Sequence, residues 1–539
     1  MYIYVQNATS IVYYDNYYKK TDGDAGGMET GIDHKRCSYA KPSFEKFRTI
    51  KKNLKENSLV PVYRTIKDPG TDPASAYEAV REKYGFLLES IEGTHKNAGY
   101  SVIGTGVLLH ITAGPEIKMT GEFNPADKFE GSKLCADSIY GILKSFEYEV
   151  PDIPGYSGGF TGYFSYDFAL KANDIPVNPD TQAGFPLAEF MMPKVFVIFD
   201  HIRKNLTFLT FVTGDGKKDP DPEYEKAVAV IESTEKKILG AALGLSKKEN
   251  ENGLLGGGGQ KKITYSSDVS EKQYEEMVRK AREYILDGDI FQVVVSRGCE
   301  CDFPGDPYLI YRQMRRINPS PYMYFMDFSE RQVVGASPEM LVRVKGRNIS
   351  SVPIAGTRKR GRTEEEDIQL EKDLVTDKKE RAEHLMLVDL SRNDIGRVSK
   401  YGSVRVTDFM SVEKFSHVQH MVSTVEGVLL DKKNSIDAFM SCFPAGTVSG
   451  APKIRAMQII EELEHKRRGL YAGAAGYIGL NENIDFAITI RTVVVKDKKA
   501  YFQSGAGIVA GSVPESEFQE AENKAASMRS AIESAGDLL

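Results

Sequence analysis

The sequence predicts a mixed α and β fold whose sheets are antiparallel or mixed rather than doubly wound. Long runs with helical periodicity alternate with short apolar runs that suit buried strands. Neighbouring strand runs are joined by short loops, which favours antiparallel pairing. With 539 residues, 41% of them hydrophobic, the chain is long enough for a large core and more than one structural unit.

The first half of the chain divides by composition. Residues 1–43 are rich in Tyr, Asp and Gly and lack periodicity, which predicts a variable N-terminal extension. Over residues 44–243, strand runs such as SVIGTGVLLHITA and KVFVIFD alternate with helical runs such as SAYEAVREKYG. Residues 244–262 combine charge, Asn and four consecutive glycines, which predicts a flexible connector before the region 263–539.

The elements of the second region follow from the same periodicities. In chain order, we expect a helix over Glu271 to Asp287, a strand over Phe291 to Arg297, further strands up to Thr357, a helix from Glu364 to about Ser391, a strand over Val418 to Val425, a helix over Ala451 to Glu464, three strands between Tyr471 and Ile508, and a last helix from about Pro514.

Composition excludes several classes of function. The net charge is −6, and no stripe of Lys and Arg suits a nucleic-acid backbone. No run reaches the length of a membrane span, and no basic segment followed by an apolar core opens the chain, so we expect a cytoplasmic protein with no membrane partner. Five cysteines in a chain of this size do not suggest a disulfide framework.

The run FPAGTVSGAPK ends in a predicted helix start near Pro452. Free N–H groups at such a start can bind a carboxylate or phosphate, although the same sequence pattern is also typical of an ordinary capped helix. Neither this run nor GAGIVAG has the spacing of a nucleotide-binding motif. The glycines Gly505 and Gly507 indicate a close approach of the backbone to a ligand, or a tight turn.

Two acidic pairs lie on predicted helices. Glu380 and Glu383 share one helix face, as do Glu517 and Glu520 on the last helix. Carboxylates completed by water and substrate oxygens suit Mg²⁺, whereas acidic surface helices are the ordinary alternative.

His420 and Arg491 occur in runs that we interpret as strands, VQHMVSTV and AITIRTVVV. A lone histidine is commonly a structural hydrogen-bonding group. A partly buried arginine instead needs a fixed anionic partner, either a ligand or one of the acids above.

Seven motifs, in order, resemble those of chorismate-utilising enzymes, and most closely those of anthranilate synthase component I. They are PIAGTRKRG, EHLMLVDLSRND, FPAGTVSGAPK, GAAGYIG, AITIRT, SGAGIV and EAENKA. The resemblance covers about residues 265–530 and extends more weakly upstream through LLESIE and GGFTGYFSYD. It implies an α+β fold, a layered sandwich of two mostly antiparallel sheets flanked by helices.

The resemblance also implies a reaction and its residues. Chorismate is aminated by ammonia, loses its ring hydroxyl and eliminates pyruvate to give anthranilate, the first step of tryptophan biosynthesis. By motif position, the implied sites are Glu383 and Glu520 for Mg²⁺; His420, Thr447 and Glu380 for catalysis, with Glu517 as a water-mediated partner; Gly356, Thr357, Tyr471, Arg491, Gly505, Ala506, Gly507 and Lys524 for chorismate; and Ser90, Pro321, Tyr322 and Met323 for tryptophan as feedback inhibitor.

Two positions distinguish among relatives. Ala355 stands where aminodeoxychorismate synthases commonly carry a nucleophilic lysine, and Gln292 where isochorismate synthases carry a lysine base. Both favour ammonia as the direct nucleophile. The alternatives are aminodeoxychorismate synthesis and a catalytically silent tryptophan-binding subunit.

No region resembles a glutaminase, so the resemblance implies a separate glutamine amidotransferase subunit, anthranilate synthase component II, in a heterotetramer. The chain contains no tryptophan. That composition suits an enzyme needed when tryptophan is scarce.

Overall fold

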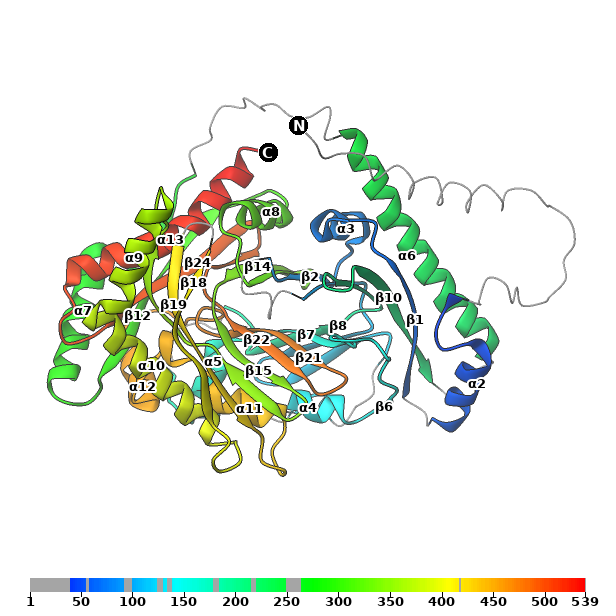
Figure 1. Cartoon of the computed structure of the whole chain (residues 1–539), viewed down its shortest axis with the longest axis horizontal. Helices are drawn as coiled ribbons and strands as arrows, with labels where there is room; N and C mark the ends of the chain where they lie inside the picture. Colours follow the sequence, from blue (N-terminus) through cyan, green and yellow to red (C-terminus); the bar gives the residue numbers. More distant parts are fainter. Residues whose placement is uncertain are drawn as a thin grey trace, which may run out of the picture.

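Within the described residues, every strand belongs to one of two large sheets that lie face to face (Figure 1). The computed structural model describes residues 39–54, 58–91, 99–123, 129–132, 138–177, 184–214, 220–248, 263–415 and 418–538. Residues 1–38 and 249–262, which cover most of the predicted extension and connector, lie outside the described residues.

Within the described residues the larger sheet has thirteen strands. In spatial order they are β11 (Ser266–Ser267), β12 (Gln292–Asp302), β24 (Lys499–Ile508), β23 (Thr492–Lys496), β14 (Arg331–Ser337), β13 (Tyr322–Asp327), β2 (Gly85–Glu89), β3 (Tyr100–Thr105), β9 (Val195–Asp200), β10 (Asn205–Gly214), β1 (Ser58–Lys67) and β6 (Glu147–Tyr148), while β20 (Gly450–Ala451) pairs with β12.

The smaller sheet has eleven strands within the same residues. They are β17 (Ile354–Lys359), β19 (Val418–Val428), β16 (Asn348–Ser351), β15 (Met340–Lys345), β22 (Ile484–Ile488), β21 (Ala474–Gly479), β7 (Gly159–Phe164), β8 (Ala188–Met192), β4 (Leu109–Ala113) and β5 (Ile117–Gly121), with β18 (Arg405–Lys414) paired to β19. The predicted antiparallel character is confirmed, although β1 and β6 pair in parallel.

Helices cover the outside of the sheets, with α7, α9, α10, α12 and α13 at one end of the molecule and α2 and α6 at the other (Figure 1). Their bounds are α2 (Phe44–Asn53), α3 (Pro73–Val80), α4 (Ser138–Leu143), α5 (Tyr166–Ala172), α6 (Pro220–Lys248), α7 (Glu271–Leu286), α8 (Pro307–Ile317), α9 (Glu364–Thr376), α10 (Lys378–Gly396), α11 (Ser435–Cys442), α12 (Lys453–Leu463) and α13 (Pro514–Gly536), with the 3-10 helix η3 (Gly446–Val448). Within the described ranges, no helix is both long and apolar enough to span a membrane.

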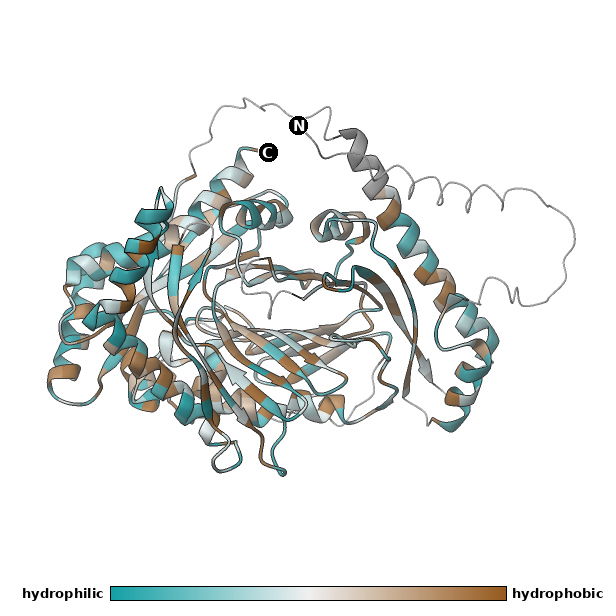
Figure 2. Ribbon diagram, viewed as in Figure 1, coloured by the Kyte–Doolittle hydropathy of each residue, from teal (hydrophilic) through white to brown (hydrophobic). Residues whose placement is uncertain are grey.

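The core lies on both faces of the larger sheet. Phe86 points into the cluster between the sheets, and its neighbour Leu87 points into the cluster beneath α3 and α8. This alternation follows from the two-residue period of a strand. Figure 2 shows hydrophobic and hydrophilic residues alternating along the strands.

Two element predictions were wrong. The helix expected from Glu364 to Ser391 breaks at Asp377, because this residue ends α9 and its carboxylate accepts hydrogen bonds from the N–H groups that open α10. The run AITIRTVVV is not one strand, since β22 ends at Ile488 and β23 begins at Thr492, which gives four strands where three were expected. The turn at Arg491, with φ +51°, separates them.

Candidate active site

His420 lies in a strand, β19 of the smaller sheet, as its sequence run predicts. It pairs with Thr357 across β19 and β17, and its Nδ1 lies 2.9 Å from the Thr357 Oγ1 and 3.3 Å from the Gly356 carbonyl oxygen. Burial lowers the pKa of His420, the Gly356 carbonyl raises it and the nearby Arg491 lowers it. The imidazole is therefore mainly neutral at pH 7 and can accept a proton.

A β-bulge at Gly356 places Glu380 next to the strand that holds this histidine. Gly356 has φ +73°, and a Cβ there would lie 3.0 Å from Glu380 Oε2 and 2.9 Å from Leu374 Cδ1. Glu380 in turn accepts a hydrogen bond of 2.9 Å from the Arg358 guanidinium. The position thus requires glycine for both its backbone angle and its space.

The two acidic helices converge, because charged residues on each helix shift the pKa of a carboxyl on the other, Glu383 on α10 and Glu517 on α13. Burial raises the pKa of Glu383; Lys379 lowers it, and Glu380, Glu520 and Glu517 raise it. Burial likewise raises the pKa of Glu517 and Glu520 adds to the rise, while the Ser512 hydrogen bond and Lys379 on α10 lower it. Carboxylates gathered in this way favour a cation among them.

The donor set at this point fits Mg²⁺ only in part. Glu383 and Glu520 are bound by lysines, at 3.7 Å from Lys379 and 2.6 Å from Lys524 respectively. Within the described part of the chain, no three His, Cys, Asp or Glu side chains form a ready cage for a metal. Two carboxylates completed by water and substrate oxygens match Mg²⁺, so the site needs a ligand to complete it.

Glu339, between β14 and β15, belongs to none of the sequence motifs above. It is 8% exposed, and burial raises the pKa of its carboxyl to about 8, while Thr447, Lys524 and Arg491 lower it. The Thr447 hydroxyl lies beside it without the geometry of a direct hydrogen bond, since its oxygen is buried and unpartnered. Glu339 is therefore a protonated acid at neutral pH, in the middle of the residues that the motifs predict. An acid in the run ASPEMLV, between two apolar strands, was the available signal.

Arg491 lies in the turn between β22 and β23. Burial lowers the pKa of its guanidinium, and Tyr471, Glu520 and Glu339 raise it. Among the described residues, no hydrogen bond or ion pair engages that guanidinium, which leaves it available to an anion. Burial raises the pKa of the Tyr471 phenol to about 12, and Arg491 is among the cations that lower it.

The segment Gly505 to Gly507 is part of β24 rather than a turn. A Cβ on Gly505 would lie 2.2 Å from the Val295 carbonyl oxygen of β12, so close strand packing requires this glycine. The Gly505 carbonyl accepts a hydrogen bond of 3.1 Å from Lys524, and the Ala506 N–H donates one of 3.1 Å to the Tyr274 hydroxyl. A Cβ on Gly507 would lie 3.0 Å from Gln292 Nε2, which places the Gln292 side chain beside the segment Gly505 to Gly507.

Two cavities are lined by members of this group. One of about 30 Å³ is lined by Glu339 and Thr447 and has room for about two water molecules. The other, of about 600 Å³, is lined by Tyr471, Thr489 and Thr492. Neither cavity by itself reaches His420 or Glu383.

The residues implied for tryptophan form a second group. β2 pairs with β13 so that Glu89 lies opposite Met323, which brings Ser90 beside Tyr322 and Pro321. The Ile91 N–H donates to the Ser320 carbonyl oxygen at 3.4 Å. The Met323 side chain is buried in the core on the other face of the strand from Tyr322.

Within the described part of the chain, a buried acid and a neutral imidazole lie near an arginine whose guanidinium has no hydrogen-bonded partner, an arrangement that suits an enzyme acting on a small anion. The family described as chorismate binding enzyme matches residues 86–530 of this chain. The chain belongs to that family.

Relatives narrow this class. The chain is 42% identical over 500 residues to anthranilate synthase component 1 of Acetivibrio thermocellus, covering 91% of this chain and 98% of that protein. For the protein of the same name from Aquifex aeolicus the identity is 43% over 498 residues, covering 91% and 97%. Within the family, the chain therefore belongs to the anthranilate synthase component 1 enzymes.

Solved structures agree with this placement. The crystal structure of anthranilate synthase component I from Streptococcus pneumoniae matches with TM-score 0.66 and 35% identity, over 81% of this chain and 95% of that one. MenF, the menaquinone-specific isochorismate synthase of Escherichia coli, matches with TM-score 0.66 and 18% identity over 91% and 98%, a likeness of fold. The expected sandwich of two mostly antiparallel sheets flanked by helices is confirmed.

Proposed function

We propose that this chain is the large subunit of an anthranilate synthase, converting chorismate and ammonia into anthranilate, pyruvate and water. The observation that carries the proposal is Glu339, a buried carboxyl with pKa about 8, beside Arg491 and Lys524. These groups offer a proton and positive charge to a dianionic substrate that must lose a hydroxyl.

The substrate carboxylates would be held at two ends of the site. Arg491 and Tyr471, assisted by the segment around Gly505 and Ala506, suit the enolpyruvyl carboxylate. Glu383 and Glu520 would hold Mg²⁺, which when bound neutralises the ring carboxylate and stabilises charge during loss of the hydroxyl. Glu380 and Glu517 support them from the same two helices, and Lys524 bridges Glu520 to the Gly505 carbonyl.

The proton steps fall to two residues. Ammonia forms the bond to ring carbon 2, while Glu339 donates its proton to the departing ring hydroxyl, which leaves as water. His420, held by Thr357 and Gly356, takes the proton from ring carbon 2 while the C–O bond to the enolpyruvyl group breaks; the ring becomes aromatic, and protonation of the released enolpyruvate at its methylene carbon gives pyruvate. Thr447 lies beside Glu339, where its hydroxyl can orient the acid.

Two positions lack the side chains that would supply a different nucleophile, which favours ammonia. Ala355 on β17 cannot attack the ring, and Gln292 at the start of β12 cannot activate water as a base. Glutamine would then be hydrolysed on a separate amidotransferase subunit in a heterotetramer. The group of Ser90, Pro321 and Tyr322 supports feedback inhibition by tryptophan, with the backbone of Met323 continuing the same strand.

The test is to incubate the purified chain with chorismate and Mg²⁺, supplying either ammonium or glutamine, and to follow anthranilate fluorescence and pyruvate, with and without tryptophan. We expect anthranilate with ammonium alone, and its suppression by tryptophan. Aminodeoxychorismate or isochorismate as product would contradict the assignment of Ala355 and Gln292. Glutamine-dependent turnover by the chain alone would contradict the separate amidotransferase.

A further inference from the structure

Tyr322 is tied to two charged side chains of the other sheet. Its hydroxyl donates a hydrogen bond of 2.9 Å to Asp485 Oδ1 and accepts one of 3.1 Å from Arg343. Arg343 Nε donates to the second oxygen of Asp485 at 2.7 Å. The side chains of Arg343 and Asp485 are 12% and 14% exposed, so these bonds are shielded from water. We call these three residues the bridging triad.

The bridging triad joins the two sheets at one point. Tyr322 is the first residue of β13 in the larger sheet, whereas Asp485 on β22 and Arg343 on β15 face each other in the smaller sheet. Movement of the Tyr322 side chain therefore pulls on two strands that are hydrogen-bonded to one another.

Both of those strands end at the candidate active site. Glu339 directly precedes β15, and Arg491 is the third residue after β22. The Ile488 N–H donates to the Glu339 carbonyl oxygen at 3.0 Å, which ties the two strand ends together. A shift of β15 against β22 would thus move the proton donor relative to the carboxylate-binding arginine.

The backbone provides a second connection between the same places. β13 pairs with β14 so that Tyr322 lies opposite Ser337. The Ser337 hydroxyl donates to the Ile488 carbonyl at 2.6 Å, and the Ala336 N–H to the Arg491 carbonyl at 3.1 Å. Side chain and backbone therefore both lead from Tyr322 to the turn that carries Arg491.

We infer that the bridging triad transmits tryptophan binding at Ser90 and Tyr322 to Glu339 and Arg491. This inference rests on the feedback inhibition proposed above. A ligand that repositions Tyr322 must carry Asp485 and Arg343 with it or lose their shared hydrogen bonds. Coupling between sites through such an element typically changes affinity by about 5- to 150-fold.

The experiment separates tryptophan binding from inhibition. In Asp485→Asn, one of the two hydrogen-bond donors loses its acceptor, because an amide nitrogen cannot accept. We expect calorimetry to give a tryptophan affinity within about threefold of the wild type, while the tryptophan concentration for half-inhibition of ammonium-dependent turnover rises about tenfold or more. Arg343→Lys, which keeps the charge but cannot reach both partners, should behave in the same way if Asp485→Asn fails to fold.

The matched control is Glu482→Gln, which removes one carboxylate charge from the turn just before β22. Glu482 is 40% exposed and pairs with Lys144, outside the bridging triad. The tryptophan concentration for half-inhibition of Glu482→Gln should therefore match that of the wild type. Normal inhibition of Asp485→Asn at equal saturation, or equal loss of binding and inhibition in both variants, would overturn the inference. A wild-type chain that binds no tryptophan would instead overturn the feedback proposal, and this inference with it.

Discussion

At the scale of single residues, the protonation of Glu339 should set the alkaline limit of activity. Burial raises the pKa of this carboxyl from 4.5 to about 8, so the acid carries its proton below that pH and loses it above. Because the protonated form is the donor, kcat should fall as pH rises through about 8. Glu339→Gln should lower kcat by about 10²- to 10⁴-fold and abolish this limb, with a smaller change in KM.

The control for that profile is Glu330→Gln, since Glu330 is a neighbouring acid whose side chain is 79% exposed. Its pH dependence should match the wild type. An unchanged alkaline limb in Glu339→Gln would assign the titration to another group and remove Glu339 from the proton step.

Glu383 and Glu520 should determine the Mg²⁺ requirement. Replacement of either by Gln or Ala removes one of the two proposed ligands, so turnover at ordinary Mg²⁺ should be nearly abolished while the fold persists. Part of the activity of the Gln variants should return as Mg²⁺ is raised. The matched control is Glu515→Gln, because Glu515 lies on α13 with Glu520 and its side chain is 64% exposed. Full activity of either variant at low Mg²⁺ would contradict the metal assignment.

Motif spacing predicts most of the residues in this site, and the structure brings the predicted acids, His420 and Arg491 together. Glu339 could not be predicted in the same way, because a single acid beside an apolar strand has no periodic signature. Its role depends on burial, which arises only when β14, β15 and η3 meet.

At the scale of elements, sequence periodicity predicts where helices and strands lie better than it predicts where they are interrupted. The helical pattern continues through Asp377, and only the capping geometry shows that α9 ends there and α10 begins. Likewise, the β-branched run around Arg491 conceals a residue with φ +51°. Local propensity favours one long element in both places, and the tertiary structure divides it.

The bulge at Gly356 offers a test of an element that positions catalytic groups. Gly356→Ala combines a left-handed backbone angle with a methyl group 3.0 Å from Glu380 Oε2. We expect a loss of about 1–3 kcal/mol in stability and a clear drop in kcat, because Glu380 and His420 are displaced. Gly346→Ala is the matched control, since that glycine has φ +59° with nothing within 4 Å.

Unfolding and turnover of these two alanine variants would be measured side by side. Gly346→Ala should show the strain alone, with normal kcat. If Gly356→Ala lost no more activity than Gly346→Ala, the crowding against Glu380 would have no functional role.

At the scale of the whole molecule, the sequence predicts the class of fold but not its assembly. Strands from before the predicted connector join both sheets, and β2 pairs with β13 in the larger sheet and β7 with β21 in the smaller one, so each sheet combines strands from both regions. The pairing of β7 with β21 joins residues about three hundred positions apart, which no local pattern encodes. The two regions that composition separates therefore share both sheets.

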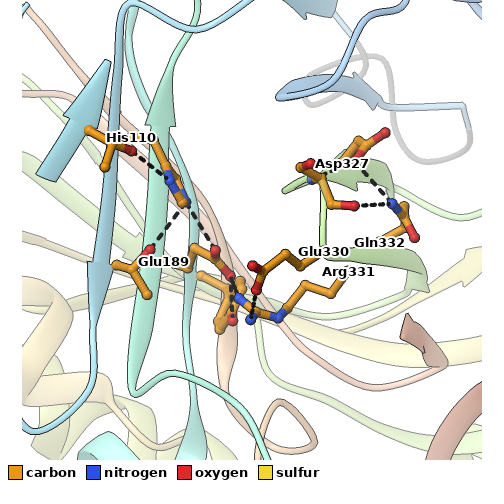
Figure 3. Close-up of polar contacts among 10 residues, drawn as sticks. His110, Glu189, Asp327, Glu330, Arg331 and Gln332 are labelled. Atoms are coloured by element: carbon orange, nitrogen blue, oxygen red, sulfur yellow. Dashed lines mark hydrogen bonds and ion pairs between the residues drawn. The ribbon is translucent and has the colours of Figure 1, made fainter. Parts of the chain in front are cut away.

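A buried polar network fastens the sheets together away from the candidate active site (Figure 3). Glu189 on β8 accepts hydrogen bonds of 2.6 Å from Arg331 and 2.9 Å from the Tyr163 hydroxyl, and its other oxygen lies 3.0 Å from His110 Nε2. Arg331 belongs to the larger sheet and the other three residues to the smaller one. The side chains of Glu189 and Arg331 are 2% and 10% exposed, so neither charge is solvated if its partner is lost.

Arg331→Met should therefore destabilise the fold by about 3–5 kcal/mol, because it leaves the Glu189 carboxylate buried without its cation. Adding Glu189→Met should restore much of that loss, since the stranded charge is then removed. Glu330→Gln, which breaks only the exposed pair with Arg331, should change stability by less than about 1 kcal/mol. The midpoints of thermal and urea unfolding would be compared for the four proteins. A double variant less stable than Arg331→Met would mean that the network is held by more than this one charge pair, and that the two sheets depend on its hydrogen bonds as a unit.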